Sequence, residues 1–114
     1  MKENIIVDKS YRFAVEMTLV CNKLKEKKEY HLASQLMRSA TSIGANVREA
    51  TAAQTKRDFI SKMSIASKEA REAYYWISIV KDPMVMDIDY SNYIKDSEEI
   101  IKILTAILKT AKSK

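Results

Sequence analysis

The sequence predicts an all-α fold, an antiparallel up-down-up-down four-helix bundle that forms one domain over residues 1–114. First, the chain has one glycine and one proline among its 114 residues, too few turn signals for a fold rich in strands. Second, apolar residues recur at helical spacing in four long segments. Short links join these segments, and long helices with short links are typical of a bundle.

The segment Leu32–Gln54 is predicted to be the central helix, because small residues crowd it and few of its side chains are charged. One apolar seam at helical spacing comprises Leu36, Ala40, Ile43, Val47 and Ala50. A polar seam beside it comprises Ser39, Ser42, Asn46, Glu49 and Ala53. The two seams predict a helix that is contacted on more than one side.

Gly44 lies in the middle of this segment, where glycine costs about 1 kcal/mol relative to alanine by helix propensity. Close approach of a neighbouring backbone would offset that cost. A kink in the helix is the alternative.

The first helix is predicted over Lys9–Lys25, with Asp8 as its N-cap. Its apolar face comprises Phe13, Met17, Val20, Cys21 and Leu24. The segment then runs into a charged turn at residues 23–29, where four lysines complement the helix C-terminus or contact phosphate.

The third helix is predicted over Lys56–Lys81, where Thr55 and Asp58 form a capping box and Pro83 stops the helix. Its stripe comprises Phe59, Met63, Ala66, Ala70, Ala73, Tyr74 and Ile77. The run Ala73–Val80 carries no charge and is apolar on all sides, which indicates burial on two faces.

The fourth helix is predicted over Tyr90–Ala111, capped by Asp89. Its seam comprises Ile94, Ile101, Leu104, Leu108 and Ala111, and Ile100, Ile103 and Ile107 widen it. The apolar surplus on the last three helices exceeds what one bundle buries, so we expect the bundle to oligomerise.

The chain is basic, with 20 Lys and Arg against 15 Asp and Glu, a formal charge of +5. The excess lies in residues 1–57, which hold eleven basic and six acidic side chains. A basic half favours an anionic partner, RNA or DNA; the alternative is that the charge serves solubility alone.

The candidate nucleic-acid contacts are the cations at two predicted helix junctions: Lys23, Lys25, Lys27, Lys28, Lys56 and Arg57. An up-down bundle puts these junctions at opposite ends. We therefore do not expect them to form one patch within a protomer.

The residue inventory argues against an enzyme, and no catalytic, cofactor or metal residue is nominated. One histidine, His31, cannot supply the paired Glu-x-x-His motifs of a di-metal bundle, and one glycine cannot form a phosphate loop. Glu69 and Glu72 lie on adjacent turns, but Lys68 and Arg71 flank them, which favours a salt-bridge lattice over a metal site.

The location is expected to be cytoplasmic, without a membrane partner. Cys21, the sole cysteine, falls in an apolar helical pattern typical of a buried side chain. The N-terminal residues lack the apolar run of a secretory signal, and no stretch is long enough for a membrane helix.

The chain resembles the small four-helix-bundle proteins encoded by intervening sequences within bacterial 23S ribosomal RNA genes. The matching residues are Gln35, Arg38, Ser39, Ser42, Ile43, Asn46, Glu49, Asp58, Phe59, Lys68, Glu69, Ala70 and Trp76. Val47 stands where the family usually has Ile, and Ala50 where many relatives have Gly.

The resemblance implies a bundle that assembles into a homopentameric barrel, in a family without an established enzymatic activity. A similar fold serves as the accessory protein of diversity-generating retroelements, a basic pentamer that engages nucleic acid and a reverse transcriptase. By that analogy, a nucleic-acid-processing protein is a further candidate partner.

The motif formed by Arg38, Ser42, Gly44, Asn46 and Glu49 is expected to act through structure. Asn46 and Glu49 should be partly buried. Glu49 should pair with an Arg or with the serine hydroxyls beside it, and Arg38 should pair on another helix or subunit. The alternative is that Arg38 and Asn46 contact RNA directly.

Two functional hypotheses remain from the sequence. The first is an oligomeric accessory factor that binds nucleic acid. The second is a structural or protein-interaction module whose basic surface is incidental.

Overall fold

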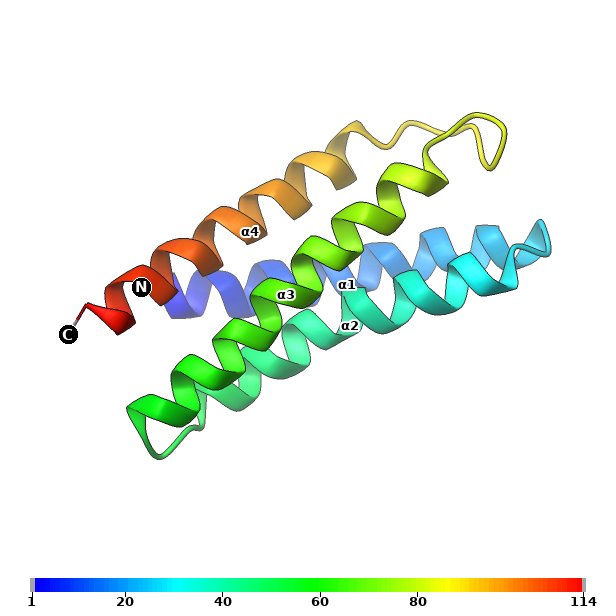
Figure 1. Cartoon of the computed structure of the whole chain (residues 1–114). Helices are drawn as coiled ribbons and strands as arrows, with labels where there is room; N and C mark the ends of the chain where they lie inside the picture. Colours follow the sequence, from blue (N-terminus) through cyan, green and yellow to red (C-terminus); the bar gives the residue numbers. More distant parts are fainter. Residues whose placement is uncertain (1, 114) are drawn as a thin grey trace.

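The computed structural model describes residues 2–113, with side chains placed from residue 5 onward (Figure 1). Its four helices are α1 (Lys2–Glu26), α2 (Tyr30–Thr51), α3 (Lys56–Val80) and α4 (Ser91–Lys112). The described part of the chain contains no strand, and the bundle measures 47 × 21 × 18 Å. The all-α, four-helix expectation is confirmed.

The helices alternate in direction, and each packs against two others. The packed pairs are α1 with α2, α2 with α3, α3 with α4, and α4 with α1, which closes a square. Figure 1 shows the start of α1, the end of α4 and the α2–α3 turn at one end, called the terminal end below. The α1–α2 turn and the α3–α4 link lie at the other, the loop end.

The core follows the predicted seams on the first three helices. Every residue of the predicted α2 seam and of the α1 face is buried. On α3, the five central stripe residues are buried, whereas Phe59 and Tyr74 at its margins are half-buried. Contact with α1 and α3 confirms that α2 is packed on two sides.

The predicted seam of α4 is right at Leu104, but the buried face is centred on Ile100 and Ile107, which were predicted only to widen the seam. Its buried residues are Ser97, Ile100, Leu104 and Ile107, while Ile94, Ile101, Leu108 and Ala111 are half-buried. Isoleucines and leucines follow one another closely between residues 100 and 108, so the apolar pattern alone does not mark the centre of the buried face. The direction in which α1 and α3 flank α4 decides it.

The helix α1 begins seven residues before the predicted start, because the fully buried Ile6 extends the apolar face by another turn. Asp8 is therefore not an N-cap. It lies inside the helix, where its Oδ2 accepts a hydrogen bond of 2.7 Å from Arg12 one turn later.

The predicted N-cap of α3 is confirmed, and the N-cap of α4 lies one residue after the predicted one. The Thr55 side chain accepts a 3.0 Å hydrogen bond from the Asp58 backbone N–H, as the capping box predicts. The N-cap position of α4 is Tyr90, not Asp89. Asp89 instead accepts bonds from the backbone N–H and hydroxyl of Ser91, which lower the pKa of its carboxyl group.

Gly44 faces α1 beside Ser10. A Cβ atom built on Gly44 would lie 3.4 Å from Ser10 Oγ and 3.7 Å from the Ser10 carbonyl carbon. Ser10 is fully buried and donates a 2.6 Å hydrogen bond to the carbonyl of Ile6. The close-approach interpretation of Gly44 is confirmed, since the neighbour includes backbone.

We expect Gly44→Leu to lower the free energy of unfolding by about 1–3 kcal/mol, because its side chain must displace Ser10. Gly44→Ala should not destabilise, since its Cβ makes ordinary contacts and alanine favours the helix by up to about 1 kcal/mol. Denaturant unfolding measures both, with Ala111→Leu on the half-buried end of α4 as the size-matched control. A Gly44→Leu protein as stable as wild type would contradict the close approach.

Candidate nucleic-acid interface

The six candidate cations divide between the two ends of the bundle. Lys23 and Lys25 lie in the last turn of α1, and Lys27 and Lys28 form the following turn, where Lys28 has a positive φ of 65°. Lys56 and Arg57 open α3 at the terminal end. All six side chains are exposed, but the structure does not bring the two groups together.

The lysine turn shares the loop end with many carboxylates. Residues 19–31 and 78–95 hold six basic side chains against five acidic ones, Glu26, Glu29, Asp82, Asp87 and Asp89. Opposite charges at one end reduce its net field. The four lysines that stand out in the sequence therefore lie in a nearly neutral region.

Arg38 lies on the outer side of the α2–α3 contact and joins the two helices. Its Nη1 donates a 3.0 Å hydrogen bond to Glu69 Oε2, and its Nη2 donates to Glu72 Oε2 and to Gln35 Oε1. The expectation that Arg38 pairs on another helix is confirmed. The expected lattice of Glu69 and Glu72 with their flanking cations is replaced by this interhelical clamp, because α2 delivers Arg38 between the two carboxylates.

Three aromatic side chains extend the clamp along the surface. Trp76 Nε1 donates a 3.0 Å hydrogen bond to Glu72 Oε2, which fixes the indole ring. His31 of α2 and Tyr75 of α3 meet that ring edge-on, with centroids 6.3 Å and 5.2 Å away. Because its guanidinium is occupied by two carboxylates, Arg38 is poorly placed to contact phosphate.

The rest of the predicted structural motif behaves differently from Arg38. Glu49 is not buried: 59% of its side chain is exposed, and it pairs with Lys62 Nζ at 3.2 Å. Burial decreases along the polar seam from Ser39, which is buried, to Glu49, which is exposed. Asn46 is half-buried as expected, and its Nδ2 donates to the carbonyl of Ser42 at 2.8 Å.

Two buried serines bond within their own helices, whereas the buried hydroxyl of Tyr90 has no hydrogen-bond partner among the described residues. The fully buried Ser39 donates to the carbonyls of Gln35 and Leu36, at 3.1 Å and 3.2 Å. Ser97 does the same toward the carbonyl of Ile94 at 2.8 Å. Such bonds let helices approach without an interhelical polar network.

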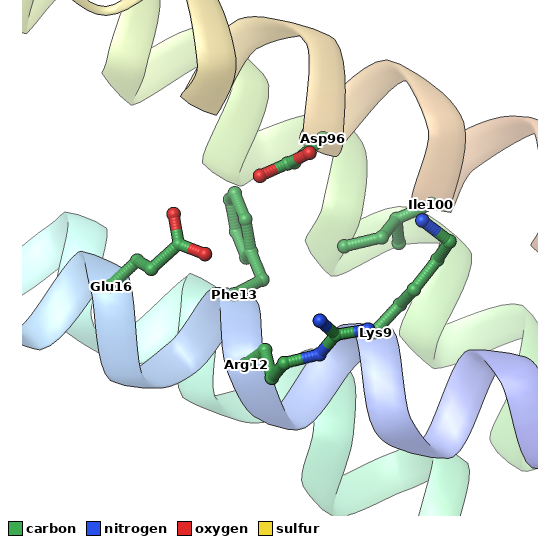
Figure 2. Close-up of a pocket in the computed structure, with 6 residues that line it drawn as sticks. All are labelled: Lys9, Arg12, Phe13, Glu16, Asp96 and Ile100. Atoms are coloured by element: carbon green, nitrogen blue, oxygen red, sulfur yellow. The ribbon is translucent and has the colours of Figure 1, made fainter.

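A hollow of about 80 Å³ separates α1 from α4, the least extensive of the helix contacts. Figure 2 shows Glu16 of α1 and Asp96 of α4 reaching into it beside the ring of Phe13. Burial, and then the charge of Asp96, raises the pKa of Glu16, while Arg12 opposes the rise. Small-molecule pockets are usually about 300–1,000 Å³, so this hollow suits water and not a cofactor.

Side chains of the types that bind metal ions are dispersed over the part of the chain that the structure describes. No three His, Cys, Asp or Glu side chains there are placed to hold a metal ion. Cys21 is fully buried, and burial raises the pKa of its thiol to about 11. Among the described helices, none is long and apolar enough to cross a membrane.

We expect Arg38→Met to lower the free energy of unfolding by about 1 kcal/mol, because it leaves the mostly buried Glu69 without its cation. The loss falls below that of a fully buried pair because half of the Arg38 side chain is exposed. Arg48→Met is the control, since Arg48 is exposed and lies over the Tyr11 ring. Equal unfolding curves for the two variants would contradict a stabilising clamp.

We expect Glu16→Gln to stabilise the protein at pH 7. A raised carboxyl pKa means that the folded state binds more protons than the unfolded state, so stability falls as pH rises from about 4.5 through the folded pKa. The glutamine variant avoids that loss, and its advantage should vanish at pH 3. Thermal melts at both pH values test this, with exposed Glu98→Gln as control.

Comparison with known proteins identifies the family to which the chain is similar. The family described as 23S rRNA-intervening sequence protein matches residues 2–106. No match is found among curated proteins.

Among solved structures, the chain is similar to a protein with unknown function from the S23 ribosomal protein family of Bacteroides thetaiotaomicron VPI-5482. The two share 43% sequence identity and a TM-score of 0.87. The match covers 96% of this chain and 99% of the other. With its four helices packed in a square and the family match over nearly its whole length, the chain belongs to the 23S rRNA-intervening sequence protein family.

Proposed function

We propose that this protein is a non-enzymatic, cytoplasmic accessory factor that assembles into a homo-oligomer and binds nucleic acid. The observation that carries the proposal is an exposed apolar face on α1. A basic surface then supplies the nucleic-acid contact. The alternative is a protein-interaction module that also forms a homo-oligomer but does not bind nucleic acid.

The exposed face of α1 comprises Tyr11, Val15 and Leu19, spaced four residues apart, with exposed fractions of 57%, 47% and 59%. Contiguous large apolar side chains on a surface mark interaction sites. The outer side of the neighbouring α2 carries the small exposed residues Ser34, Thr41 and Ala45. Small side chains permit a second helix to lie close.

The outer side of α4 is different in kind. Its exposed residues are Lys95, Glu98, Lys102, Thr105 and Lys109, a pattern suited to water. The asymmetry supports assembly through the α1–α2 side with α4 facing outward. The ring of five subunits implied by the family resemblance fits this arrangement, because cyclic contacts join two different surfaces of each protomer.

Assembly multiplies the charge of the protomer. Five chains of +5 carry a formal charge of about +25, which favours binding to a phosphate backbone without base readout. Such binding depends steeply on salt, because each phosphate contact releases counterions. A reverse transcriptase or another nucleic-acid-processing protein is a compatible further partner.

The expected mass in solution is about 65 kDa, five copies of 13.1 kDa, and light scattering measures it. Double substitution Val15→Glu with Leu19→Glu should lower that mass while the helical signal remains, since both side chains are exposed in the protomer. Thr105→Glu on the outer side of α4 is the control and should leave the mass unchanged.

Nucleic-acid binding is tested by filter binding of the unmodified protein to a labelled single-stranded RNA at several salt concentrations. The proposal requires that the logarithm of the binding constant falls linearly with the logarithm of the salt concentration, with a slope of about −0.7 for each phosphate contacted. A monomeric mass would overturn the assembly. An oligomer with no RNA affinity at low salt would leave the interaction module as the function.

A further inference from the structure

The fold gathers an excess of positive charge at the terminal end. Three segments distant in sequence meet there: residues 5–12, 48–62 and 102–113. Together they hold nine basic side chains against three acidic ones, a formal charge of +6. The corresponding segments of the loop end reach a formal charge of only +1.

Part of this charge is already engaged. Lys9 pairs with Glu99 at 2.9 Å, Lys62 pairs with Glu49, and Arg12 pairs with Asp8. Arg57, Lys109 and Lys112 are all exposed and form no ion pair with any side chain that the structure describes. These three cations are available to an anionic partner.

Helix electrostatics explain only some of these positions. Lys109 and Lys112 lie in the last turn of α4, where cations are favourable because they oppose the helix dipole. Arg57 lies in the first turn of α3, where the dipole disfavours a cation. An anionic partner that binds at this end would favour a cation at the start of α3 as well as those at the end of α4.

We infer that the terminal end, centred on Arg57, Lys109 and Lys112, is the surface that binds the phosphate backbone of RNA. The inference rests on the proposed function and assigns its site. Cations on separate segments suit a polyanion with regularly spaced charges better than a single small anion. In a cyclic assembly the terminal ends of all subunits lie on one face, so the charge of each protomer adds to a shared surface.

Two triple variants test the site. Arg57→Gln, Lys109→Gln and Lys112→Gln together remove three charges from the terminal end. Lys23→Gln, Lys25→Gln and Lys27→Gln remove three from the loop end, so both proteins have the same net charge. Filter binding to a labelled single-stranded RNA is measured across several salt concentrations, after light scattering has shown the same particle mass as wild type.

We expect the terminal-end variant to lose RNA affinity by about tenfold or more and its salt slope to become shallower by about 2, since three contacts each contribute about 0.7. The loop-end variant should bind within about twofold of wild type, because its lysines are offset by neighbouring carboxylates. Equal losses in both variants, or a larger loss at the loop end, would overturn the assigned site while leaving RNA binding intact. Wild-type protein that does not bind RNA would overturn the proposed function itself.

Lysine acetylation of the unmodified protein with and without RNA gives a second readout that no folding defect can affect. Mass spectrometry should show RNA protecting Lys109 and Lys112 but leaving Lys23, Lys25 and Lys27 reactive. The reverse pattern would place the site at the loop end. Anionic vesicles that protect Lys109 and Lys112 as well as RNA does would overturn the choice of RNA as partner.

Discussion

The close approach of α1 and α2 at Ser10 and Gly44 is the constraint on which the bundle depends. The space between Gly44 and α1 accepts no side chain much larger than a methyl group, and Ser10, which faces Gly44, is fully buried and bonds within its own helix. Ser39 and Ser97 likewise donate to carbonyl groups of their own helices. These three buried serines therefore need no hydrogen-bond partner on a neighbouring helix, and shape governs how the helices pack around them.

Much of the fold follows from the sequence, because helical periodicity marks buried faces directly. Where one apolar stripe stood out, as on α2, every seam residue is buried. On α4, where apolar residues are too numerous, the pattern misplaced the seam. The start of α1 was missed because Asp8 resembles a cap, although Ile6 before it also belongs to the core.

The candidate site was harder to predict, since its parts are separated in sequence. The four lysines between residues 23 and 28 are conspicuous in the sequence, yet the fold places them at the same end of the bundle as the acidic α3–α4 link. The lysines of α4 are not conspicuous, because the basic and acidic side chains of residues 58–114 are equal in number. Topology decides which charges become neighbours. The partners of Glu49 and Arg38 illustrate the same point, as each ion pair joins α2 to α3.

The even number of antiparallel helices has a practical consequence. Because α1 begins and α4 ends at the terminal end, a purification tag or reporter fused at either terminus lies at the same end of the bundle as Lys109 and Lys112. Such a fusion would shield that surface or alter its charge. The α3–α4 link, where 94% of Met84 is exposed, lies at the far end of a bundle 47 Å long. A label attached to that link would report on the molecule without touching the surface that carries its charge.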